Sequence, residues 1–104
     1  MNRRPPAWTS LDADILVPHR RADLVEDVLD AEGVLHDPRT GRTHRMNQTA
    51  LAVWRSCDGS KTTRQIARRL TEQYEVTRER ALDHVEQLLV LFAEGQLLDS
   101  ETPA

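Results

Sequence analysis

The chain has 104 residues, a formal net charge of −3 and 30% charged residues. This length supports a single hydrophobic core, so we expect one compact domain with one principal site or surface. Acidic and basic residues are interspersed without a long basic run, which argues against nucleic acid as a partner. We find no apolar stretch of membrane-spanning length and no signal-peptide h-region, and therefore expect no membrane association and a cytoplasmic protein.

Cysteine and histidine do not form a metal or redox motif in this sequence. The chain has a single cysteine, Cys57, and its four histidines are His19, His36, His44 and His84. No two histidines have i,i+4 helical spacing, and none stands beside a second potential ligand at a spacing typical of zinc sites. We therefore expect no metal, no cofactor and no catalytic residue, and predict that the protein is not an enzyme.

The first part of the chain is expected to be an arm followed by a strand. Residues 1–21 are rich in proline and lack sustained periodicity, which predicts a partly disordered arm. Residues 22–30 have apolar positions at helical spacing, but the run is short and lies between turn signals. The next segment predicts a β-hairpin, which is only marginally stable without a third strand. We therefore favour a strand over residues 24–30.

A β-hairpin is predicted over residues 34–46. Pro38 presets φ for a turn, and Gly41 can adopt the positive φ that such a turn requires. The return strand covers residues 42–46. Alternation along this strand places Arg42, His44 and Met46 on one face and Thr43 and Arg45 on the other.

Three helices are predicted after the hairpin. Asn47 caps the first, which stops at Asp58–Gly59; Thr62 or Thr63 caps the second. Thr77 caps the third, which runs over residues 78–94 and ends at Gly95. The first helix has an apolar stripe made by Ala50, Leu51, Val53 and Trp54, and one face of the second carries Ile66, Ala67, Leu70 and Tyr74. On the third helix we expect the following residues to be buried: Ala81, Leu82, Val85, Leu88, Leu89 and Phe92.

This order predicts an α+β fold of the winged helix-turn-helix type, in which a three-stranded antiparallel sheet is followed by three helices. We expect residues 22–99 to form the domain and residues 100–104 to form a C-terminal tail. The fold alone does not state a function.

Five short segments, in this order and at these intervals, resemble the PqqD family. They are GVLHDPRTG (33–41), HRMNQTA (44–50), VW (53–54), CDG (57–59) and TRQI (63–66). The resemblance covers roughly residues 22–98. The sequence departs from the family pattern at Met46, where leucine is more usual, and at His84, a position that is often acidic. The arm lies outside the shared region.

The resemblance implies a RiPP recognition element, a non-catalytic domain that binds the leader segment of a ribosomally made precursor peptide. Its partners would be that peptide and a maturation enzyme such as a radical-SAM enzyme, a cyclase or a leader peptidase. In the family the leader adds beside the third strand and lies in a cleft against the third helix. The implied peptide-binding residues are Arg42, Thr43, His44, Arg45, Met46, Arg80, His84, Gln87, Leu88 and Leu91.

Strand addition is physically reasonable because an edge strand offers unpaired backbone N–H and C=O groups to an extended peptide. On the third helix, one shoulder carries Arg80, His84, Gln87 and Leu91, and the other carries Leu82, Glu86 and Leu89. We choose the first shoulder as the groove wall, with Leu91 as its apolar anchor. Arg45 and Arg80 are expected to pair with leader carboxylates.

The sequence is also compatible with other functions. A winged helix-turn-helix regulator would bind DNA, although the third helix is acidic and only the second, with Arg64, Arg68 and Arg69, is basic. An adaptor that docks an enzyme without any peptide ligand is a further alternative. The return strand can also be interpreted as an ordinary edge strand that binds no peptide, whose two arginines protect it against aggregation. Because the same edge can pair with a second copy, we expect a monomer or a homodimer.

Overall fold

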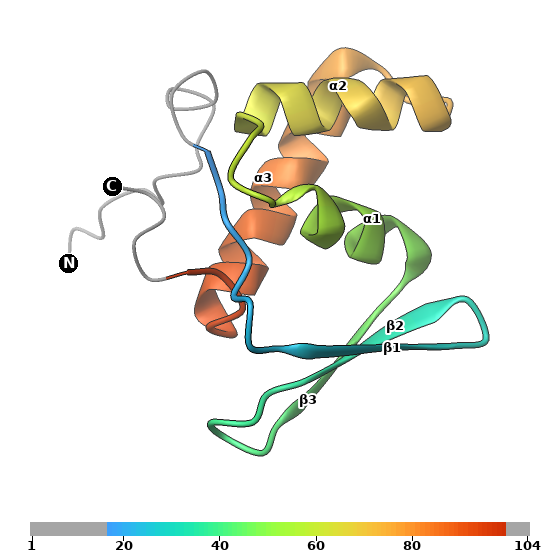
Figure 1. Cartoon of the computed structure of the whole chain (residues 1–104). Helices are drawn as coiled ribbons and strands as arrows, with labels where there is room; N and C mark the ends of the chain where they lie inside the picture. The colour runs from blue at the N-terminus through green and yellow to red at the C-terminus, as the bar shows by residue number, and fades with distance from the viewer. Residues whose placement is uncertain (1–16, 100–104) are drawn as a thin grey trace, which may run out of the picture.

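A computed structural model of the chain describes residues 17–99. The predicted α+β order is confirmed: three antiparallel strands precede three helices (Figure 1). The arm and tail predicted for residues 1–16 and 100–104 lie outside the described residues. The elements are β1 (Val25–Leu29), β2 (Glu32–His36), β3 (Thr43–Met46), α1 (Gln48–Ser56), α2 (Thr63–Gln73) and α3 (Arg78–Glu94).

The sheet has the order β1-β2-β3, so β2 is central and the other two strands lie at the edges. A two-residue turn joins β1 to β2, and both of its residues, Asp30 and Ala31, have positive φ (51° and 67°). The backbone twist of such a turn matches the right-handed twist of the strands, so two residues are enough to connect β1 and β2. Pairing with β2 is also what makes residues 25–29 a strand despite their helical spacing.

The core lies between the inner face of the sheet and the helices. Helix α1 packs against β2 and β3, and α2 lies above α1 in the view of Figure 1 and crosses α3. Leu35 on β2 and Leu89 on α3 are completely buried. The sheet and α1 approach so closely that a Cβ on Gly33 would lie 2.6 Å from Leu51 Cδ1, so a larger residue there would require the Leu51 side chain to move.

Each helix begins at a predicted capping residue. The side chains of Asn47, Thr62 and Thr77 accept hydrogen bonds from backbone N–H groups in the first turns of α1, α2 and α3. Thr62 also forms a capping box with Gln65, which selects it over Thr63. Two predictions were wrong. Tyr74, which we placed on the apolar face of the second helix, is the C-cap of α2 and is 39% exposed, because the chain becomes extended there. Leu82, which we expected to be buried, is only partly buried.

Residues 17–21, which we had assigned to the arm, are held against the domain by backbone hydrogen bonds. The Arg20 N–H donates to the Cys57 carbonyl (2.7 Å), and the Arg21 N–H donates to the Leu97 carbonyl (3.1 Å). A Cβ on Gly59 would collide with the His19 imidazole, so this segment lies directly on the α1–α2 loop. These contacts join the N-terminal segment, the end of α1 and the chain after α3.

The described helices include none that is long and apolar enough to cross a membrane.

Candidate peptide-binding site

Strand β3 is an edge strand whose outer side is available. Among residues 17–99, its only hydrogen-bonded strand neighbour is β2. The Asp37 N–H donates to the Arg42 carbonyl (2.8 Å). Asp37 and Arg42 are therefore a hydrogen-bonded pair, and the register of β2 and β3 shows which of the following pairs are also hydrogen bonded. Because such pairs alternate along an antiparallel ladder, His44 and Met46 direct their backbone groups to β2. The N–H and C=O groups of Thr43 and Arg45 therefore point outward.

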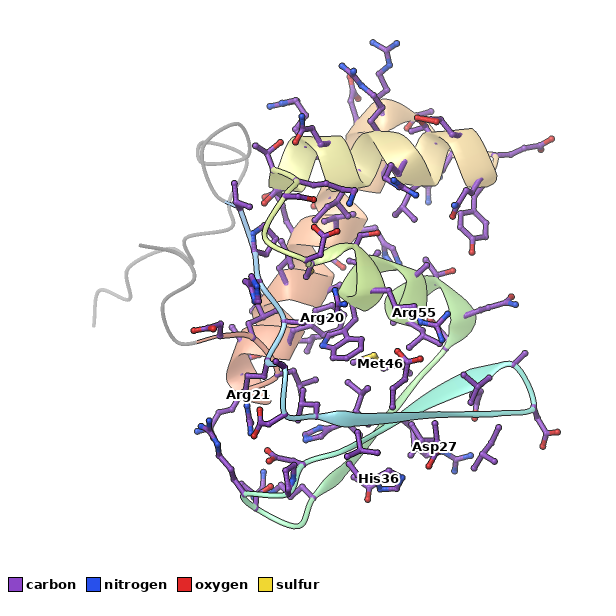
Figure 2. The ribbon with its side chains drawn as sticks, in the orientation of Figure 1. Arg20, Arg21, Asp27, His36, Met46 and Arg55 are labelled. Carbon is purple, nitrogen blue, oxygen red and sulfur yellow. The ribbon has the colours of Figure 1, made fainter. Side chains whose placement is uncertain are left out.

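The side chains of β3 divide between the two faces of the sheet, as the sequence predicted. Met46 points toward the helices and is 6% exposed, whereas Thr43 and Arg45 lie on the outer face. There Arg45 pairs with Glu32 (3.1 Å) and Thr43 contacts His36 Nδ1 (3.3 Å). Figure 2 shows the same division, with Met46 on the helix side and His36 on the opposite side. Arg42 directly precedes the strand.

Three of the predicted helix residues line one hollow on α3. Arg80, His84 and Gln87 share a hollow of about 580 Å³, together with Glu75, Val76, Thr77 and Asp83. The Asp83 carboxylate accepts a hydrogen bond from Gln87 Nε2 (3.1 Å). Arg80 and Asp83 give the hollow charges of both signs, which suits a polar peptide.

The two predicted leucines of α3 differ in exposure. Leu91 is 61% exposed although it is a large apolar side chain. It lies on the same helix stripe as Arg80, His84 and Gln87. Leu88 belongs to the hydrophobic core and is 9% exposed, so its side chain supports the helix from beneath. Met46 and Leu88 therefore present little side-chain surface to a ligand.

A smaller, apolar hollow of about 180 Å³ adjoins the first and shares His84 and Val76 with it. Its remaining lining is Thr49, Leu70, Tyr74 and Ala81. We did not predict Thr49, Tyr74 or Val76 as site residues, because they come from three different segments. The one signal in the sequence was Tyr74 itself, an aromatic residue directly after a helix.

The strip of surface between β3 and α3 is fixed at both ends. At one end, His44 Cε1 lies 3.5 Å from the position that a Cβ on Gly95 would take, directly after α3. At the other end, Thr49 and His84 line the same apolar hollow. β3 and α3 therefore run in opposite directions: β3 lies beside the end of α3, and the chain that follows β3 lies beside an earlier part of α3. The Nε2 atom of His44 is buried without a hydrogen-bond partner among the described residues.

Arg21 ties the two sides of this strip together. Its guanidinium donates to Asp37 at the β2–β3 turn (3.0 and 3.1 Å) and to the Gln96 carbonyl after α3 (2.9 Å). It also pairs with Asp23 (2.7 Å). These hydrogen bonds hold the pKa of the Asp37 carboxyl well below its ordinary value and raise the pKa of Arg21. Figure 2 shows Arg21 at the corner where the N-terminal segment meets the sheet.

The described residues offer little chemistry for catalysis. Burial raises the pKa of the Cys57 thiol to about 12, so it stays protonated and is a poor nucleophile. No group of three or more His, Cys, Asp or Glu side chains within residues 17–99 is arranged to hold a metal ion. What the geometry does provide is an open strand edge beside a partly apolar helix face.

Comparisons with known proteins identify the family and the fold. The family model described as "Coenzyme PQQ synthesis protein D (PqqD)" matches residues 32–98, which is more than half of the chain. No curated protein matches the chain. Three similar solved structures share the fold, at TM-scores of 0.70 or 0.71.

Two of these structures contain a leader peptide. TbiB1 in complex with the TbiA(beta) leader peptide has a TM-score of 0.70 and 21% identity, and the match covers 79% of this chain and 95% of that one. Lasso peptide synthetase B1 complexed with the leader peptide has a TM-score of 0.71 and 24% identity, and the match covers 80% of this chain and 98% of that one.

The third structure is a solution NMR structure of the PqqD truncation of Methylobacterium extorquens PqqCD, described as a functional and stand-alone RiPP recognition element. It has a TM-score of 0.70 and 22% identity, and the match covers 90% of this chain and 99% of that one. These likenesses agree with the family match and with the three-strand, three-helix order. The resemblance found in the sequence is thereby confirmed, and the chain belongs to the PqqD family.

Proposed function

We propose that this protein binds the leader segment of a ribosomally made precursor peptide and presents it to a modifying enzyme or leader peptidase. The observation that carries the proposal is the open outer edge of β3 beside the exposed stripe of α3. Membership of the PqqD family and the leader peptides bound to two structures of the same fold support it.

The leader would bind as an added strand. An extended peptide beside β3 hydrogen bonds to the outward N–H and C=O groups of Thr43 and Arg45, which gives affinity without sequence selection. Its side chains then alternate between the two faces of the enlarged sheet. Those on the outer face would meet Arg45, and those on the inner face would meet the stripe of α3.

Selectivity would come from the helix side. Leu91 offers an exposed apolar contact, and the apolar hollow beside His84 has room for one side chain of modest size. Arg80 is suited to a leader carboxylate because its planar guanidinium forms two hydrogen bonds at once. The domain thus acts by holding the leader in an extended form, while a partner enzyme carries out the reaction.

The test is calorimetric titration with a synthetic peptide covering the leader of the precursor encoded beside this protein's gene. Thr43→Pro removes an outward N–H, and Leu91→Glu places a charge on the helix stripe. We expect each to weaken binding by about ten-fold or more, since each removes a contact worth roughly 1–2 kcal/mol.

Two matched controls separate binding from folding. Thr43→Val keeps the β-branched shape and the N–H, and Val28→Glu adds a charge at an equally exposed apolar site on β1. Both should bind like the parent, and circular dichroism should show all four variants folded. If Thr43→Pro and Leu91→Glu bind as tightly as the parent, the proposed groove is wrong. If the parent itself does not bind, the enzyme-docking adaptor becomes the better hypothesis.

A further inference from the structure

A third hollow lies on the opposite shoulder of α3, where α2 packs against it. It has a volume of about 110 Å³ and is lined by Arg64, Ala67, Arg68, Arg78 and Leu82. Three arginines and two apolar residues therefore line it. None of the lining residues carries a carboxylate, although acidic residues outnumber basic ones in the chain as a whole.

Two of these arginines have no acidic partner among the described residues. Neither Arg68 nor Arg78 makes an ion pair or a side-chain hydrogen bond within residues 17–99, and both are exposed. Arg42, Arg69 and Arg80 likewise make no ion pair within residues 17–99, whereas Arg45 pairs with Glu32 and Arg55 pairs with Glu26. Arg64 already interacts within the molecule. Arg68 and Arg78 are set apart because they line one hollow together, beside Arg64.

The hollow and the leader groove lie on opposite sides of α3. At 100° per residue, Arg78 and Leu82 lie about 180° around the helix from Gln87 and Leu91. Helix α3 itself therefore separates the two surfaces. A partner bound in the hollow would not cover β3, and a leader bound along β3 would leave the hollow accessible.

We propose that this hollow is a docking point for an acidic segment of the modifying enzyme, in which an Asp or Glu stands next to an apolar residue. The inference rests on the proposed function for the identity of the partner. Arg68 and Arg78 would share the carboxylate through paired N–H donors, and Ala67 and Leu82 would contact the neighbouring apolar side chain. These two apolar residues also exclude water, which strengthens the charge-assisted hydrogen bonds.

Charge and shape favour an acidic protein segment over nucleic acid at this place. A nucleic-acid surface needs a row of basic residues that follows successive phosphates. Here the basic residues surround one small hollow. The exposed face of α3 that continues from it carries Glu79 and Asp83, which would repel a phosphate backbone.

The probe is a short peptide of glutamate, leucine and glycine, titrated into the labelled full chain and followed by NMR. We expect shifts confined to the amides around Arg68, Arg78 and Leu82. The double variant Arg68→Gln/Arg78→Gln should weaken binding about ten-fold, because two charge-assisted hydrogen-bonding groups are lost. A matched peptide with glutamine in place of glutamate should produce no shifts.

Arg69→Gln is the matched control. Arg69 is the next residue along α2 but lines a different hollow, with Arg55 and Lys61, so its loss removes a charge without altering the proposed site. It should change the affinity by less than about two-fold, as expected for an exposed charge outside a contact. Equal weakening by Arg69→Gln would mean that the peptide senses net charge alone, and would overturn the proposal.

Two further measurements complete the test. Duplex DNA that shifts the same amides at lower concentrations than the acidic peptide would overturn the proposal in favour of nucleic acid. Leader binding is titrated on the same variants. If the leader binds and the acidic peptide does not, the docking point is refuted while the proposed function stands. If only the acidic peptide binds, the docking point stands and the proposed function is refuted.

Discussion

The residue with the most consequential contacts in this fold is Arg21, whose side chain is only 9% exposed. A buried charge is costly unless it is paired and fully hydrogen bonded. Arg21 meets that requirement through two carboxylates and one carbonyl oxygen. Asp37 in turn accepts from the Arg39 N–H (2.9 Å) as well as from Arg21, so the β2–β3 turn is shaped around this ion pair.

The ion pair predicts a pH dependence of stability. Because Arg21 lowers the pKa of folded Asp37, the stabilisation is complete above the ordinary aspartate pKa of about 4 and is lost as the pH falls below it. Asp37→Asn should therefore lower Tm most at about pH 7, and the difference in Tm between the variant and the parent should be smaller at about pH 3. Thermal melts monitored by circular dichroism measure both.

Glu32→Gln is the control for this prediction, because it removes a carboxylate from the exposed pair with Arg45. We expect a change in unfolding free energy of no more than about 1 kcal/mol for such a surface pair. If the difference in Tm between Asp37→Asn and the parent stays constant across the pH range, the ion pair is not the source of the pH dependence.

At the scale of the elements, the β1–β2 hairpin shows a local strain that the rest of the fold tolerates. Asp30 and Ala31 both have positive φ, which is common for asparagine and glycine but unfavourable for alanine. The sequence therefore does not contain the usual signal for this turn. Pairing of β1 with β2 along its whole length compensates for the strain.

Relieving the strain should stabilise the protein. We expect Ala31→Gly to raise the free energy of unfolding by about 0.5–1 kcal/mol, because glycine adopts this φ without a steric penalty. Ala52→Gly, in the middle of α1, should lower it by about 1 kcal/mol, since glycine is unfavourable inside a helix. Urea unfolding of the two variants tests the prediction, and a loss of stability in both would contradict it.

At the scale of the whole molecule, one network sets the distance between the two walls of the groove. Arg21 joins the β2–β3 turn to the segment that follows α3, and its own backbone N–H donates to Leu97. The strand that offers the open edge and the helix that faces it are therefore fixed by the same side chain. Within this fold, the N-terminal segment positions the candidate site without belonging to it.

We predict that Arg21→Lys weakens leader binding by several-fold while the fold is retained. Lysine keeps the charge, but its single ammonium group cannot reach two carboxylates and a carbonyl oxygen at once. Arg20→Lys is the control, because Arg20 bonds to the carbonyls of Arg55 and Cys57, away from the groove. Titration with the same leader peptide compares them, and equal affinities for the two variants would argue against a positioning role for Arg21.

Much of the fold could be predicted because its signals are local. Asn47 and Thr77 begin helices wherever such capping residues precede an apolar periodic run. The strand character of residues 25–29 needed an argument about the whole sheet, because their local spacing is helical. Tyr74 was misassigned because the same periodicity continues past the last residue of α2, and only packing determines where the helix stops.

The candidate site was predictable only in part. Arg80, His84 and Gln87 share a hollow because i,i+3 and i,i+4 spacing alone places them on one helix face. The same spacing placed Leu88 on the core face and Leu91 on the exposed shoulder, and the two side chains are 9% and 61% exposed. Thr49 joins His84 through folding of distant segments, and no local pattern records that contact.

The sequence by itself determined the helices, their capping residues and the β2–β3 hairpin, because each depends on interactions between residues close along the chain, and its short motifs determined the family. The tertiary structure alone decided that the backbone groups of Thr43 and Arg45 face outward and that Arg21 joins the sheet to the end of α3. It also decided that Arg68 and Arg78 meet around one hollow. These features depend on packing between residues far apart in sequence, where burial and charge pairing outweigh local preference.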